Sequence, residues 1–256
     1  MDRRSCVLYE QDEPVVTLTI DQPERSNALS AAVRTGLWDG LRRFEMDDAA
    51  RVLTITGAGD KAFCAGADLS EMAEGALGQL PLDYMPMIGH NITVSKPVIA
   101  AVNGAALRAG FLLAQMASLA VAAENVTFGM PEVRWSRGAP WSVPLGRMIY
   151  RRQWIELVLT GTPIGAQRAY EIGLVNKVVP SGELLDVTRV LAASIAANAP
   201  LTIAATLRMV SMSAQMGEDT AWDVADHIFQ PVYRSADAIE GPRAFREKRA
   251  PAWNGQ

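Results

Sequence analysis

The stretch Pro97–Gln115, which reads PVIAAVNGAALRAGFLLAQ, constrains the fold more than any other part of the chain. Its β-branched apolar run at Val98–Val102 is typical of a buried strand. The chain then turns at Asn103-Gly104, crosses a small-residue loop at Ala105–Gly110 and continues as an apolar helix from Phe111. A buried strand, a tight loop and a buried helix in this order aim backbone N–H groups at an anionic ligand or transition state.

Further strands are predicted where β-branched runs occur, and helices where apolar residues recur at helical spacing. The predicted strands are 15–20, 52–56, 118–123, 126–128 and 175–179, and the predicted helices are 30–47, 144–159, 165–172, 183–198, 200–216, 220–228 and 235–247. Alternation of strands and helices in the first half indicates an α/β fold with a mostly parallel sheet and right-handed crossovers. Because strand signals are few in the second half, we expect a core over 1–195 and a helical region over 196–256.

Composition and patterning exclude several classes of protein. The net charge of −4 gives no general attraction to nucleic acid or to an anionic membrane. The apolar run 111–123 is too short to span a bilayer, and the N-terminus lacks the apolar segment of a signal peptide. Cys6 and Cys64 match no metal-binding spacing. We therefore expect a cytoplasmic protein without a metal site.

Five stretches of the chain carry a resemblance to a known family. They are PERSNAL (23–29), KAFCAGADLSE (61–71), KPVIAAVNGAAL (96–107), FGMPEVRW (128–135) and SADAIEGPRAFREKRAP (235–251). Taken together and in this order, they resemble the enoyl-CoA hydratase/isomerase (crotonase) superfamily. The resemblance implies an acyl-CoA enzyme with a crotonase-type β/α spiral core, a helical C-terminal oligomerisation region, and assembly as a homotrimer or a dimer of trimers. It implies no cofactor, because CoA enters as the thioester substrate.

The resemblance also implies an oxyanion hole. Removing or adding an α-proton on a CoA thioester creates an enolate-like oxyanion, and one backbone donor aimed at it is worth about 3–4 kcal/mol. By residue matching, the donors are the backbone N–H groups of Ala67 and Ala109. Ala109 and its neighbour Arg108 depart from the run of glycines that is usual in the family. Taken alone, both loops would be read as tight turns between a strand and a helix.

The positions that face CoA follow from the same match. Those near its phosphates, adenine and pantetheine are Arg25, Ala28, Ala65 and Leu69, and those that reach the CoA of a neighbouring subunit are Phe245 and Lys248. Cations near phosphates are physically reasonable. The alternative for the last two is an ordinary buried Phe and a surface cation.

Acid/base chemistry in this family depends on two positions, which are Leu112 and Glu132 here. Hydration of a 2-enoyl-CoA is best served by a carboxylate at both. Moving a double bond from the 3- to the 2-position needs only one, which takes a proton from C2 and returns it at C4. An apolar Leu112 would also raise the pKa of Glu132 by desolvation. The alternative for Glu132 is a glutamate placed by the dipole in the first turn of a helix that starts at Pro131.

The segment after Glu132, RWSRGAPWSVPLGR, has lost the usual glycine cluster and contains Trp135 and Trp141. With Leu112, these side chains are expected to form a reshaped acyl pocket, although tryptophan there also suits a core or a subunit interface. The sequence favours an enoyl-CoA isomerase. The alternatives are an enoyl-CoA hydratase of specialised or low activity and a CoA-binding pseudoenzyme.

Overall fold

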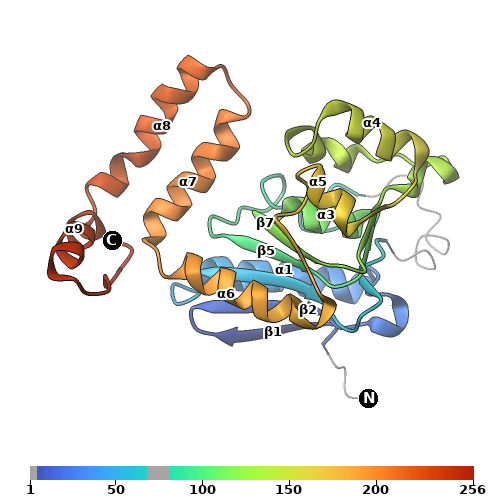
Figure 1. Cartoon of the computed structure of the whole chain (residues 1–256), viewed down its shortest axis with the longest axis horizontal. Helices are drawn as coiled ribbons and strands as arrows, with labels where there is room; N and C mark the ends of the chain where they lie inside the picture. The colour runs from blue at the N-terminus through green and yellow to red at the C-terminus, as the bar shows by residue number, and fades with distance from the viewer. Residues whose placement is uncertain (1–4, 68–80) are drawn as a thin grey trace.

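The computed structural model describes residues 5–67 and 81–256 and contains two β-sheets (Figure 1). The larger sheet has six strands in the order β1-β2-β3-β5-β7-β10. Its strands are β1 (Val7–Asp12), β2 (Val15–Ile20), β3 (Val52–Gly57), β5 (Val98–Val102), β7 (Leu119–Ala123) and β10 (Lys177–Val179). β1 pairs antiparallel with β2, and every other neighbouring pair is parallel.

The smaller sheet is interleaved with the larger one along the chain. It has four strands in the order β4-β6-β8-β9, namely β4 (Ala62–Cys64), β6 (Ala105–Leu107), β8 (Thr127–Gly129) and β9 (Ile164–Gly165). β4 follows β3, β6 follows β5, and β8 follows β7. Each turn of the chain therefore places one strand in each sheet. This arrangement is a β/α spiral and confirms the predicted α/β fold class.

Helices cover the larger sheet. α1 (Ala31–Met46) packs on β1 and β2, and α6 (Leu184–Ala196) packs on β2, β3, β5 and β7. Every residue of β3 and β5 is buried as a result, as expected for parallel strands covered by helices. The Ser30 hydroxyl accepts a hydrogen bond from Val33 N at the start of α1, which confirms the predicted helix and its cap.

The structure differs from the predicted elements where local signals are weak. β1 was not predicted, because it is an edge strand with a half-exposed pattern. β4 and β6 lie in segments that were predicted to be loops. Both strands are short and lack β-branched residues, so they give no strand signal. One helix was predicted over 144–159, and the structure has two helical elements there. Pro140 begins η3 (Pro140–Arg147), and the extended backbone of Tyr150 separates it from α4 (Arg151–Thr160).

The remaining helical elements are η1 (Pro23–Arg25), α3 (Ala109–Met116), η2 (Pro131–Trp135), α5 (Ala166–Glu171), η4 (Ser181–Glu183), α7 (Pro200–Ser213), α8 (Glu218–Tyr233) and α9 (Ala236–Glu247). α7 and α8 pack side by side and project from the sheets, with α9 beyond them (Figure 1). In the described part of the chain, no single helix has the length and apolarity to cross a membrane. One bent pair, 181–196 with 200–213 at 105°, meets that test by length and composition alone.

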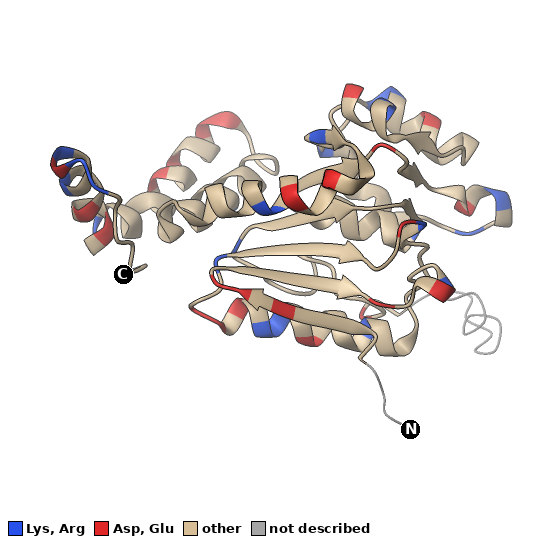
Figure 2. Cartoon of the chain, turned by 60° about the horizontal axis from the view of Figure 1, so that its bottom comes forward, with Lys and Arg blue, Asp and Glu red and all other residues tan. Residues whose placement is uncertain are grey.

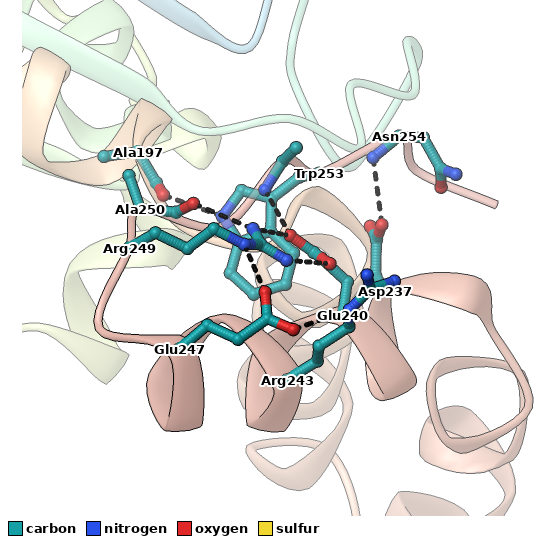
Figure 3. A network of polar contacts seen from close by, with 10 residues as sticks. Ala197, Asp237, Glu240, Arg243, Glu247, Arg249, Ala250, Trp253 and Asn254 are labelled. Carbon is teal, nitrogen blue, oxygen red and sulfur yellow. Dashed lines mark hydrogen bonds and ion pairs between the residues drawn. The ribbon is translucent and has the colours of Figure 1, made fainter.

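A polar network ties the C-terminal tail to α9 and to the end of α6 (Figure 3). Arg249 bonds Glu240 at 2.9 Å and Glu247 at 2.8 Å. The indole of Trp253 donates to the carbonyl oxygen of Ala197 at 2.8 Å, just beyond α6. The buried Asp237 carboxylate accepts the backbone N–H groups of residues 254 and 255 at 2.9 and 3.0 Å. Both signs of charge consequently gather on α9 (Figure 2).

Candidate active site

Two asparagine side chains, the buried Asn27 and the half-buried Asn103, hold the turn between β3 and β4. Asn27, from PERSNAL, donates its Nδ2 hydrogens to the carbonyl oxygens of Ala58 at 3.0 Å and Ala62 at 2.7 Å. Asn103, from VNGAAL, donates to the carbonyl oxygen of Gly59 at 2.7 Å and accepts from Gly57 N at 3.1 Å. The two motifs therefore fix the loop that leads to Ala67.

The loop after β4 and the loop after β6 contact each other directly. Gly66 has φ +94°, and a methyl group added to it would lie 2.9 Å from Leu107 O and 3.2 Å from Ala109 N. A methyl group added to Gly110 would lie 2.0 Å from Cys64 O. Only glycine permits this close approach of the two backbones.

This close approach brings the loop that contains Ala67 against the loop that contains Ala109. Ala67 directly follows Gly66 and is bridged to Leu29. Ala109 is the first residue of α3, so its N–H has no acceptor within that helix. Both residues are buried. The N-terminal end of α3 adds a positive partial charge at the same point.

The residues matched to the CoA path lie in different places. Ala28 and Ala65 come together because Ala65 N donates to Ser26 O at 3.1 Å, and the exposed Arg25 ends η1 beside them. Leu69 lies outside the described residues. Phe245, 87% exposed, and the exposed Lys248 lie in and just after α9, at the other end of the molecule from α3 (Figure 1).

Glu132 lies in the first turn of η2 and is buried. Its Oε2 atom has no hydrogen-bond partner among the residues that the structure describes. Burial raises the pKa of the Glu132 carboxyl, while its own backbone N–H and the charge of Arg108 act in the opposite direction. A carboxylate with a free oxygen and a raised pKa is suited to act as a general base.

The position matched to a second carboxylate is apolar. Leu112 lies on α3 and is buried in the hydrophobic core. Among the acidic residues that the structure describes, only Glu132 and Asp237 are buried, and Asp237 belongs to the C-terminal network. The described part of this site therefore holds one buried carboxylate.

Glu132 also lies on the wall of a cavity of about 680 Å³ between η2, η3 and α4. The other lining residues are Met130, Val133, Arg137, Ala139, Ser142, Gly146, Arg151, Trp154, Ile155, Val158 and Leu159. Most of this lining is apolar, as in small-molecule pockets generally.

The predicted pocket residues Leu112, Trp135 and Trp141 are not among the described lining of this cavity. Trp135 is 56% exposed, Trp141 packs half-buried against the core, and Trp154 supplies the aromatic wall. The contribution of α4 was missed. Its apolar residues at helical spacing predict a buried face, but they do not say which element that face covers.

Among the described residues there is no metal-binding group, and the Cys64 thiol is not reactive. Within 5–67 and 81–256, no group of three or more His, Cys, Asp or Glu side chains is placed to hold a metal ion. Complete burial raises the pKa of the Cys64 thiol to about 12, so it is not a thiolate nucleophile near neutral pH.

Comparison with known proteins agrees with this geometry. The sequence profile of the enoyl-CoA hydratase/isomerase family matches residues 10–256. A carnitinyl-CoA dehydratase from Salmonella typhi is 36% identical, over 95% of this chain and 96% of its own. An enoyl-CoA hydratase from Mycobacterium tuberculosis H37Rv has a TM-score of 0.91 at 38% identity, covering 99% of this chain and 100% of that one. One from Bacillus anthracis has a TM-score of 0.88 at 31% identity, covering 98% and 100%. The chain is a member of the enoyl-CoA hydratase/isomerase (crotonase) superfamily of acyl-CoA enzymes.

Proposed function

We propose that this enzyme isomerises 3-enoyl-CoA thioesters to 2-enoyl-CoA thioesters, with Glu132 as the only acid/base group. The observation that carries the proposal is the buried Glu132 carboxylate, which is the only one on the cavity wall within 5–67 and 81–256 and whose Oε2 has no partner in those ranges. Leu112, which the resemblance matches to the second carboxylate of a hydratase, is apolar and buried.

In this mechanism the Glu132 carboxylate removes a proton from C2 of the substrate. The electron pair of the C–H bond moves into the thioester carbonyl and gives a dienolate. The N–H groups of Ala67 and Ala109 donate to its oxygen, and each such donor contributes about 3–4 kcal/mol. The protonated Glu132 returns the proton at C4, the carbonyl re-forms, and the double bond lies between C2 and C3.

Hydration is the second candidate, and the names of the relatives favour it. Both the carnitinyl-CoA dehydratase and the enoyl-CoA hydratases are named for adding or removing water. With one carboxylate, hydration requires Glu132 to activate water for attack at C3 and to supply the proton at C2. This double task makes a slow reaction the expected outcome.

The test supplies the purified enzyme with a 3-enoyl-CoA and, separately, with a 2-enoyl-CoA, and identifies the products by mass and NMR. Isomerisation that is abolished in Glu132→Gln and kept in the exposed control Glu124→Gln supports the proposal. Hydration that Glu132→Gln leaves unchanged would contradict the role of Glu132. Binding of CoA esters with turnover of neither substrate would support a CoA-binding protein without catalysis.

We further propose that the region 196–256 forms contacts in a homotrimer or a dimer of trimers. Large apolar side chains on its helices are exposed in the single chain, and these include Trp222, Tyr233, Ile239 and Phe245. Exposed apolar surface of this kind is typical of an interface. Light scattering measures the assembly, and a monomer at micromolar concentration would contradict it.

A further inference from the structure

Arg108 has a backbone conformation that is unfavourable for its residue type. It precedes α3 with φ 55° and ψ −132°. A side chain other than that of glycine is strained at such a positive φ, and strain of this kind concentrates at functional sites. The residue lies between Leu107, which pairs with Gly129, and the proposed oxyanion donor Ala109. The question is what its side chain does there.

The side chain of Arg108 is half-buried and lies on an aromatic ring. Its Cζ atom is 4.9 Å from the ring centroid of Trp135, within the range of a cation–π contact. In the described part of the chain, no carboxylate lies within ion-pair distance of it. Because Trp135 belongs to η2, this contact fixes the position of the Arg108 charge relative to η2.

The same stack places that charge beside Glu132. Glu132 and Trp135 are three residues apart in a 3₁₀ helix, where side chains at this spacing eclipse each other. The backbone N–H of Arg108 donates to Gly129 O at 3.0 Å, which ties its loop to the strand that leads into η2. The charge of Arg108 lowers the pKa of Glu132 and so opposes the effect of burial.

Other charged side chains around Glu132 lie at the protein surface, whereas Arg108 is half-buried. Arg137 and Arg151 line the cavity, and both are exposed. Arg134, in η2, bonds Thr162 Oγ1 at 3.3 Å. Glu156, on α4, faces a separate small cavity, and Arg147, at the end of η3, is exposed. Within α3 itself there is no charged side chain.

We propose that Arg108 is a positioning residue for the base: stacked on Trp135, it keeps a positive charge beside Glu132 and maintains this carboxylate in its ionised form. The inference rests on the proposed role of Glu132. It assigns a task to the side chain that directly precedes α3. The strained backbone is then a consequence of placing this charge in the loop before α3.

The test compares Arg108→Met, Arg108→Gly and Arg108→Lys with the wild type. Arg108→Gly removes the charge and the strain together, so it guards against a variant that fails to fold. Arg42→Met is a matched control, because Arg42 also stacks on a tryptophan, Trp38, at 4.9 Å, but on the exposed surface of α1.

The first measurement is the ¹³C NMR titration of the Glu132 Cδ atom, assigned by its absence from Glu132→Gln. The titration midpoint is expected to rise in Arg108→Met and Arg108→Gly and to stay close to that of the wild type in Arg108→Lys and Arg42→Met. A midpoint unchanged by loss of the Arg108 charge would overturn the proposal. Since this signal needs no turnover, it tests Arg108 even if the enzyme proves not to be an isomerase.

The second measurement is the pH profile of kcat/KM with a 3-enoyl-CoA. On its acidic limb, Arg108→Met is expected to lose about threefold in kcat/KM and to recover at higher pH, because a nearby charge acts on ionisation. A loss of the same size at every pH would indicate a purely structural role and would also overturn the proposal.

Discussion

Gly66→Ala is the substitution that most directly tests the contact between the two loops that we propose to form the oxyanion hole. The added methyl group would lie 2.6 Å from Cβ of Arg108 and 2.9 Å from Leu107 O, whereas ordinary van der Waals contact begins at 3.4 Å. Both obstructing atoms belong to or adjoin the backbone and cannot rotate away. The Ala109 loop must therefore move away from Ala67.

Two effects of different size are expected. The φ of +94° costs an L-residue about 1–2 kcal/mol, which lowers the Tm by about 5 °C in a chain of this size. Displacing one oxyanion donor lowers kcat by about 10²-fold or more, since such a donor acts chiefly in the transition state. The variant is thus expected to fold and to bind CoA esters, but to turn over slowly.

The assay measures kcat, KM and Tm for Gly66→Ala beside Gly182→Ala. The control is suitable because a methyl group added at Gly182 meets nothing within 4 Å. The reasoning is refuted if Gly66→Ala keeps kcat within about twofold of the wild type while its Tm falls as expected. An equal loss of kcat in the control would refute it as well.

Three further outcomes are expected. Leu112→Glu, which adds a second carboxylate, should raise hydratase activity and lower the Tm, because it buries a charged group; no gain in a folded variant would exclude Leu112 as the missing catalytic position. Burial raises the folded-state pKa of Glu132 above its unfolded value. The contribution of this carboxyl to the free energy of unfolding is therefore present at acidic pH and is lost as the pH rises through the raised pKa. Glu132→Gln should therefore raise the Tm near neutral pH while abolishing isomerisation, and an unchanged or lower Tm there would contradict the assigned pKa. Arg249 lowers the pKa of Glu240 to about 2, so their contact should persist at pH 4 and weaken only as the pH falls toward 2; hydrogen exchange in α9 should rise in Arg249→Met, and unchanged exchange would show that the contact does not hold the tail.

Local chemistry explains which parts of the molecule could be predicted from the sequence. Ser30 caps α1 through a bond to a residue three positions away, and Asn103-Gly104 ends β5 as expected. Both features depend on neighbours in the sequence. The five motifs likewise carried the family and the fold, because each is a short run with its own backbone requirement.

Features that depend on distant packing could not be predicted. The cavity beside Glu132 takes part of its wall from α4, and a helical pattern alone does not say what the helix will cover. Trp135 is partly exposed and its ring contacts Arg108, because the pairing of β6 with β8 brings their two loops together. Ala67 and Ala109 were named from the sequence, but the glycine contacts that bring their loops together are visible only in three dimensions.

The hydrogen bonds made by the Asn103 side chain have a consequence for deamidation of the enzyme. An Asn-Gly pair is prone to deamidation when the glycine nitrogen can attack the asparagine side chain. Here Asn103 is held by Gly57 and Gly59, and Gly104 is so tightly packed that a methyl group on it would lie 2.5 Å from Lys61 C. The folded state therefore protects this pair. Deamidation would therefore require local opening of this loop. The aspartate that forms has no amide group to donate to Gly59 O, so this hydrogen bond would not re-form when the loop folds back.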